Sequence, residues 1–170
     1  MKILKSFCLA LCLLSANIST AHAAFIDGVN LGGGFMWNDS VRPSFDSAGG
    51  IALHTSVHVN LPGPFIFAPF YDISFASPIM QTLGMSLNYA IGMRDFESHK
   101  LFFGPSIGLV LSTDDKNDSV SERFIGGELG YKFPIGEKLG IFVRIKFVED
   151  QNDVVSGFSG HIGATFKLFQ

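Results

Sequence analysis

The sequence predicts an all-β fold: an eight-stranded antiparallel up-and-down transmembrane β-barrel. Apolar and polar residues alternate with a period of two in eight stretches, and successive side chains of a strand point to opposite faces. Each stretch holds about 11 residues, and a strand needs roughly 9–11 to cross a bilayer. Short turns mostly alternate with longer polar connections, which is typical of up-and-down barrels.

The first 23 residues are expected to lie outside the fold. Two lysines precede an apolar run over 7–14, and Ala21-His22-Ala23 has the small-x-small form of a signal-peptidase site. The sequence therefore predicts a signal peptide over 1–23 and one transmembrane β-barrel domain over 24–170. Both cysteines of the chain lie in this leader, so cleavage would leave a barrel without disulfides.

The strands are expected where the alternation is regular. Residues 138–149 show it clearly, with Leu139, Ile141 and Val143 on one face and Arg144 and Lys146 on the other. The predicted strands, in order, cover residues 25–37, 51–61, 65–75, 83–94, 101–112, 124–133, 138–149 and 158–168.

One phase of the alternation is almost purely apolar, and the other is mostly Gly, Ala, Ser and Asn with a few charges. The second phase has too few charged side chains for a surface in bulk water, but its small residues suit the narrow interior of an eight-stranded barrel. The apolar phase carries aromatic residues near both strand ends, as the two interfaces of a bilayer favour. Those expected at the long-connection end are Trp37, Phe75, Phe147 and Phe158, and those at the short-turn end are Phe65, Tyr89, Phe103, Tyr131, Phe133 and Phe166.

Three positions break the pattern. Asp27 falls in the apolar phase, and Pro69 and Pro105 lie inside predicted strands. Proline has no N–H to donate to a ladder, and a closed barrel has no free edge. We expect a local bulge or distorted pairing at each proline.

Composition excludes some functions. The net charge is −3, whereas nucleic-acid binding requires clustered Lys and Arg. We therefore expect no nucleic acid as a partner, and no motif in the sequence indicates a cofactor.

The chain resembles the small eight-stranded outer-membrane barrel proteins of Gram-negative bacteria, of the OmpA/OmpX-like type. The resemblance covers essentially all of 24–170 and rests on the leader, the strand count, the loop asymmetry and the last strand, SGHIGATFKLFQ. It implies location in the cell outer membrane, with short periplasmic turns and longer outer loops. It also implies outer-membrane lipid and lipopolysaccharide as surroundings, and insertion by the barrel-assembly machinery. Proteins of that class usually end on an aromatic residue, whereas here Phe169 precedes Gln170.

The inward phase carries charges that we expect to pair. A turn at 134–138 that pairs Phe133 with Leu139 would set Glu128 opposite Arg144. A turn at 62–64 that pairs Leu61 with Phe65 would set His54 opposite Asp72. The sequence thus predicts a structural polar network inside the barrel, made by His54, Asp72, Glu128, Lys132, Arg144 and Lys146.

Two chemical sites are alternatives to this network. His54-Thr55-Ser56 has the H-x-S spacing of lipid A deacylases with this fold, but both side chains belong to the inward phase, and the Asn that follows the Ser in that family is Val57 here. His54 and His58 would lie about 13 Å apart along one strand, too far for one metal ion, although His161 could join one of them. We expect no catalytic residue and no metal.

The sequence therefore favours a non-enzymatic outer-membrane barrel that contributes to envelope integrity or surface interaction through its loops, with a side-chain-filled interior and no wide pore. We expect a monomer. The alternatives are a lipid-modifying barrel enzyme or carrier of small apolar compounds, marked by an outward polar pair or a lateral opening, and a secreted soluble barrel with the apolar phase inside.

Overall fold

The structure is a computed structural model that describes residues 26–40, 48–75, 79–92, 99–113, 119–150 and 155–168. The expected signal peptide, the chain end at 169–170 and most of the connections between strands lie outside these residues. The described strands are β1 Ile26–Ser40, β2 Ala48–Asn60, β3 Phe65–Ser74, β4 Ile79–Gly92, β5 Lys100–Thr113, β6 Ser119–Pro134, β7 Leu139–Asp150 and β8 Val155–Phe166.

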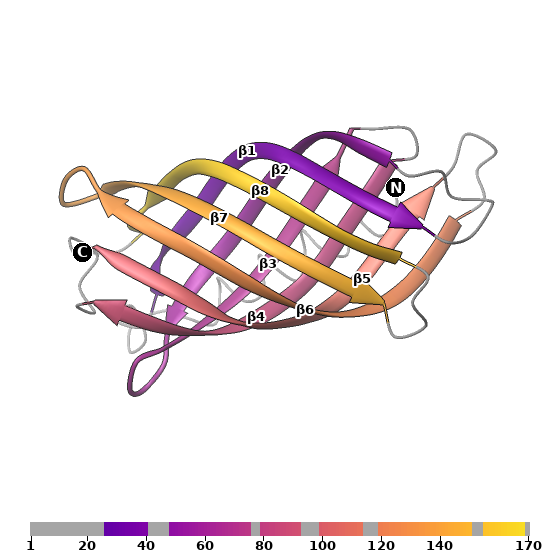
Figure 1. Ribbon diagram of the computed structural model, residues 1–170. Helices are drawn as coiled ribbons and strands as arrows, with labels where there is room; N and C mark the ends of the chain where they lie inside the picture. Colours follow the sequence, from indigo (N-terminus) through magenta and orange to yellow (C-terminus); the bar gives the residue numbers. More distant parts are fainter. Residues whose placement is uncertain are drawn as a thin grey trace.

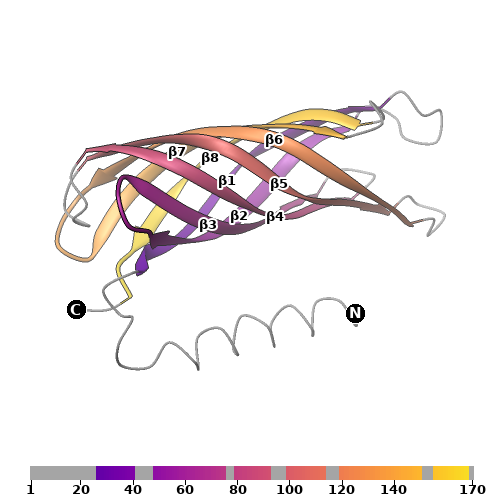
Figure 2. The same ribbon diagram turned by 90° about the horizontal axis from the view of Figure 1, so that it is seen from below.

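The eight strands close into one barrel in which each strand pairs with its neighbours in the chain (Figure 1). All neighbouring pairs are antiparallel, and β1 pairs with β8 to close the sheet. Seen from below, the strands are strongly tilted, as closure of a small barrel requires (Figure 2). The predicted fold class is confirmed. Within the described residues, no helix is long and apolar enough to cross a membrane.

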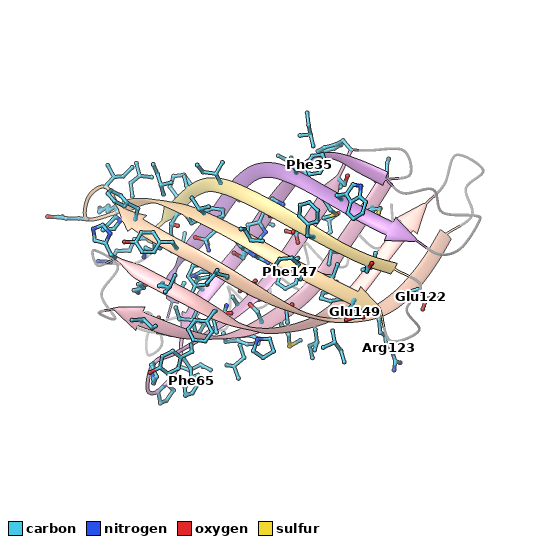
Figure 3. All side chains as sticks on the ribbon, in the orientation of Figure 1. Phe35, Phe65, Glu122, Arg123, Phe147 and Glu149 are labelled. Carbon is cyan, nitrogen blue, oxygen red and sulfur yellow. The ribbon has the colours of Figure 1, made fainter. Side chains whose placement is uncertain are left out.

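Most of the large apolar side chains face outward, and the polar phase, together with several phenylalanine and methionine side chains, faces the interior (Figure 3). On the outer face, Trp37 and Phe158 contact each other with ring centroids 5.8 Å apart near the ends of their strands. At the other end, Tyr89 contacts both Phe65 and Phe103, at 5.9 and 5.8 Å. Both expected aromatic groups therefore lie on the outer surface, at opposite ends of the barrel.

Inward glycines make room for aromatic rings that fill the interior. A Cβ on Gly130 would lie 2.2 Å from the Phe102 ring, and one on Gly32 would lie 2.7 Å from the Phe142 ring. Phe102 and Phe142 are both 1% exposed. Glycine costs strand stability, and here close packing across the interior requires it.

A β-bulge explains why Asp27 breaks the alternation. The β1–β2 register shifts between Ile26 and Gly28. The extra residue of a bulge changes the phase of the side chains on either side of it. Asp27 therefore points inward, 4% exposed, although the regular alternation would place it on the outer face.

The two strand prolines interrupt the ladder without shifting it. In the β2–β3 pair the register runs from Ser56↔Phe70 to Val59↔Phe67 and skips two pairs at Pro69. In the β4–β5 pair two pairs are skipped at Pro105 in the same way. Each proline keeps its pairing on the other side, with Met85 and Gly127. The expected distortion is present, but neither proline forms a bulge.

One predicted register is wrong by two residues. The β6–β7 turn closes with hydrogen bonds from the Ile135 and Gly136 amides to the Leu139 carbonyl. Phe133 consequently lies opposite Ile141, and Glu128 lies opposite Lys146 rather than Arg144. The prediction placed the turn too close to Phe133. The register at 62–64 is as predicted, with His54 opposite Asp72.

Candidate functional site in the barrel interior

The structure places all six predicted network residues inside the barrel, each at most 4% exposed. His54 comes from β2, Asp72 from β3, Glu128 and Lys132 from β6, and Arg144 and Lys146 from β7. They form two connected groups in the middle of the barrel and a third group nearer the short turns.

The first group surrounds Glu128. Arg144 Nη2 lies 2.9 Å from Glu128 Oε2, so the predicted partners meet diagonally despite the register error. Ser86 Oγ donates to Glu128 Oε1 at 2.6 Å, and Asn88 Nδ2 donates to the same oxygen. A buried carboxylate is stable only when it is paired and hydrogen-bonded, and Glu128 is both.

The second group surrounds Asp72. His54 Nδ1 lies 2.5 Å from Asp72 Oδ1, and Lys146 Nζ contacts Asp72 Oδ2. Arg144 Nη1 lies 2.8 Å from His54 Nε2, so this arginine joins the two groups. Lys146 Nζ also lies 3.7 Å from the centre of the Phe70 ring, a cation–π contact that helps to replace lost hydration.

The third group was not predicted. Asp27 accepts hydrogen bonds from Lys100 at 2.5 Å and from Lys132 at 3.0 Å. Sequence reasoning included Lys132 without this partner and omitted Asp27 and Lys100. The signal was present, because a carboxylate that breaks an otherwise apolar phase must be turned inward or be solvated.

Seven apolar residues fill the interior on the side of the long connections. They form one buried cluster, which we call the apolar section: Met36, Ala52, Phe70, Met80, Val110, Phe124 and Val148. The rings of Phe70 and Phe124 have centroids 6.3 Å apart. The interior is therefore divided along its length into an apolar section and a charged section. The sequence pattern predicted charged residues inside the barrel but not this division.

His161 joins His54 across the interior, with ring centroids 5.1 Å apart. Ligand atoms of His54, Asp72 and His161 lie within 4.8 Å of one another, and the two ring nitrogens of His161 have no hydrogen-bond partner among the residues that the structure describes. However, Arg144 contacts His54 Nε2, and Lys146 contacts Asp72. A metal ion would have to bind beside these two cations, so the arrangement suits a polar network better than a metal centre.

Ser56, His54 and Asp72 are connected in the order of a hydrolytic triad. His54 Nε2 lies 2.9 Å from Ser56 Oγ, while Nδ1 faces Asp72. A triad histidine must accept the serine proton at that nitrogen, and here Arg144 Nη1 lies 2.8 Å from it. Ser56 is 2% exposed and also accepts a hydrogen bond from Asn30. The connectivity resembles a triad, but the Arg144 contact with the histidine nitrogen and the burial of Ser56 oppose catalysis.

Buried side chains occupy the interior behind the ladder interruptions at the two prolines. Behind the skipped β2–β3 pairs lies His58, which packs edge-on against Phe102 with centroids 5.1 Å apart. Behind the skipped β4–β5 pairs lies Asn88, which is fully buried and bonded to Glu128.

Comparison with solved structures finds the same fold. Neisserial surface protein A is 14% identical and matches 85% of this chain and 97% of its own, with a TM-score of 0.65. The N-terminal β-barrel domain of Pseudomonas aeruginosa OprF is 10% identical over 82% of this chain and 96% of its own, with a TM-score of 0.56. Yersinia pestis Ail, described as an attachment invasion locus protein and solved with a heparin analogue, is 10% identical over 82% of this chain and 95% of its own, with a TM-score of 0.52.

These structures are small eight-stranded outer-membrane barrels of the OmpA/OmpX-like type, so the resemblance of the fold is confirmed. No protein-family model and no curated protein sequence matches the chain.

Proposed function

We propose that the chain is a non-enzymatic outer-membrane barrel that supports the envelope or displays its loops to surface partners. One observation carries this proposal: the barrel is arranged inside out, with apolar side chains on its outer surface and ion pairs in its interior. Among the described residues, some thirty large apolar side chains are exposed and four lysine and arginine side chains are buried, which a water-soluble barrel would not show. Lipid is the medium that suits such a surface.

The solved structures with this fold support that location, since they include a surface protein and an attachment protein. In the proposed setting the barrel is a monomer surrounded by outer-membrane lipid and lipopolysaccharide, and the barrel-assembly machinery inserts it. The filled interior supports a role at the surface rather than in transport.

The primary test is recovery and electrophoretic behaviour. The chain should fractionate with the outer membrane and, after folding in detergent, migrate differently in unheated and boiled SDS samples. Closed barrels resist SDS because every ladder bond is internal. Recovery as a water-soluble protein without detergent would refute the proposal.

A substitution on the outer face sharpens this test. Val143 is 48% exposed on the outer face of β7, and Val143→Arg should destabilise the barrel in bilayers by about 2–4 kcal/mol, as a charge at mid-membrane does. The measurement is urea unfolding in lipid vesicles, with Val143→Leu as the matched apolar control. Equal stability of the Arg variant would show that this face does not meet lipid.

The alternative of a lipid-hydrolysing enzyme is favoured by the connectivity of Ser56, His54 and Asp72. A fluorophosphonate probe separates the two candidates, because it labels an activated serine covalently. We expect no labelling of the folded wild type in detergent, with Ser56→Ala as the reference for background. Labelling that is lost in Ser56→Ala would establish the enzyme alternative.

A further inference from the structure

The outer wall of the barrel has a hollow near the long connections, formed by β6, β7, β8 and β1, which we call the trough. Its volume is about 790 Å³, within the range of about 300–1,000 Å³ typical of small-molecule sites. We propose that the trough binds an acyl chain of lipid A, the lipid part of lipopolysaccharide, at the point where the chain joins the headgroup. This inference rests on the proposed membrane function.

One side of the trough is a row of aromatic side chains. Trp37 on β1 lies opposite Phe158 on β8, which lies opposite Phe147 on β7. All three line the trough and are exposed on the outer face. The row ends at Gly127 on β6, opposite Phe147, where an added Cβ would have its nearest atom at 3.6 Å. A hydrocarbon chain can therefore lie along the rings and pass this open end without a clash.

The other side of the trough is polar. Two residues nearer the long connections, Ser156 on β8 lies opposite Glu149 on β7, so both side chains are close enough to contact one ligand group. Both are exposed, and Figure 3 shows Glu149 nearer the loop end of β7 than Phe147. Among the lining residues that the structure describes, Glu149 is the one that carries a charge. A carboxylate only accepts hydrogen bonds, so its partner must supply an N–H or O–H group.

The depth of the trough determines which lipid reaches it. The aromatic row belongs to the group expected at the membrane interface on the long-connection side. In the proposed orientation this side faces the outside of the cell, where lipopolysaccharide forms the leaflet. Burial of a tail alone gives little preference, because bulk lipid tails are as apolar as the rings. The preference must therefore come from the polar side of the trough.

Lipid A supplies the donors that Glu149 requires. Its acyl chains include amide-linked 3-hydroxyacyl chains, which carry an N–H and a hydroxyl group where the chain meets the sugar. Glu149 can accept a charge-assisted hydrogen bond from either group. The ester linkages of a phospholipid supply only acceptors at this depth. The phosphates of lipid A are repelled by Glu149, so recognition depends on the acyl linkage and not on phosphate.

Native mass spectrometry of the full chain tests this proposal, using detergent micelles doped separately with lipid A, dephosphorylated lipid A or phosphatidylcholine. Phosphatidylcholine is the ester-linked reference, because it has no N–H or O–H donor. The wild type should retain one lipid A, should retain the dephosphorylated form at least as well, and should retain less phosphatidylcholine. Preferential retention of phosphatidylcholine, or loss of binding on removal of the phosphates, would overturn the proposal.

Two substitutions locate the site. Gly127→Leu should lose most of the lipid A retention, because the leucine closes the open end of the trough. Gly33→Leu is its matched control, since Gly33 lies on the outer face of β1, outside the trough, with its nearest atom 3.9 Å from an added Cβ. Glu149→Gln should lose the preference for lipid A over phosphatidylcholine, because an amide can also donate to an ester carbonyl. Glu137→Gln, in the exposed turn between β6 and β7, makes the same charge change at the other end of the barrel and should keep the preference.

Each variant is first checked for the gel shift of a folded barrel, and Glu149→Gln carries the test if Gly127→Leu does not fold. Retention of lipid A by folded Gly127→Leu at the wild-type level, or an unchanged preference in Glu149→Gln, would refute the site. A heat-modifiable wild type that retains no lipid refutes the trough as a lipid site but leaves the membrane function intact. A wild type that needs no detergent refutes the membrane function itself.

Discussion

The two sections of the barrel interior are filled by different chemistry. The apolar section on the long-connection side is packed with Phe70, Phe124, Met36, Met80 and their neighbours. The charged section holds Asp27, Asp72 and Glu128 with their lysine and arginine partners. Both sections are buried, since members of each are at most 9% exposed.

The difference teaches that a closed barrel this narrow needs a filled interior rather than a polar one. Apolar side chains fill it by packing alone, and their loss leaves a cavity. Charged side chains fill it only as complete sets, because one unpartnered charge is costly. The two sections should therefore respond differently to single and paired substitutions.

The largest effect is expected in the charged section. Glu128→Ala should destabilise the fold by about 3–5 kcal/mol, because Arg144 then stays buried without the carboxylate that it pairs with. The double variant Glu128→Ala with Arg144→Ala should lose less stability than Glu128→Ala alone. Urea unfolding in detergent or vesicles measures both, and strictly additive losses would show that the two residues are not coupled.

The alternation of residues was sufficient to predict the strands and the direction of both faces, because the period of two follows directly from strand geometry. It could not reveal which interior residues meet across the barrel. The contact between Arg144 and His54 spans 90 positions in the chain and depends on strand stagger, which no local pattern encodes. Likewise, the bulge at Asp27 and the turn at Ile135 each change the register by amounts that turn-forming residues alone do not specify.

The next effect tests how tightly the apolar section is packed. A Cβ on Gly84 would lie 2.5 Å from the Ile107 carbonyl oxygen and 2.8 Å from the Phe70 ring. Gly84→Ala should therefore destabilise the barrel by about 1–3 kcal/mol through overpacking. Gly140→Ala, near the short turns, meets its nearest atom at 3.0 Å and should have a smaller effect in the same unfolding assay. The opposite order would indicate that the apolar section is the looser of the two.

A smaller effect is expected from trimming the apolar section without adding strain. Val110 is 4% exposed, and Val110→Ala should destabilise by about 1–2 kcal/mol, the value of two buried methyl groups. The loss should not change between low and high salt, because no charge is altered. Unfolding at two ionic strengths checks this, and a salt-dependent loss would mean that the substitution disturbs the neighbouring ion pairs.

The last prediction concerns conduction, where almost no signal is expected from the wild type. Both sections block the interior, and an apolar constriction also excludes water and ions by dewetting. Steady conductance in planar bilayers should therefore be negligible, and it should remain so in Glu128→Ala, because the apolar section is unchanged. Joint replacement of Phe70 and Phe124 by Ala removes the two rings whose centroids lie 6.3 Å apart and should permit brief openings. Large, stable steps from the wild type, or openings in Glu128→Ala that match those of the double Phe variant, would show that the apolar section is not the barrier.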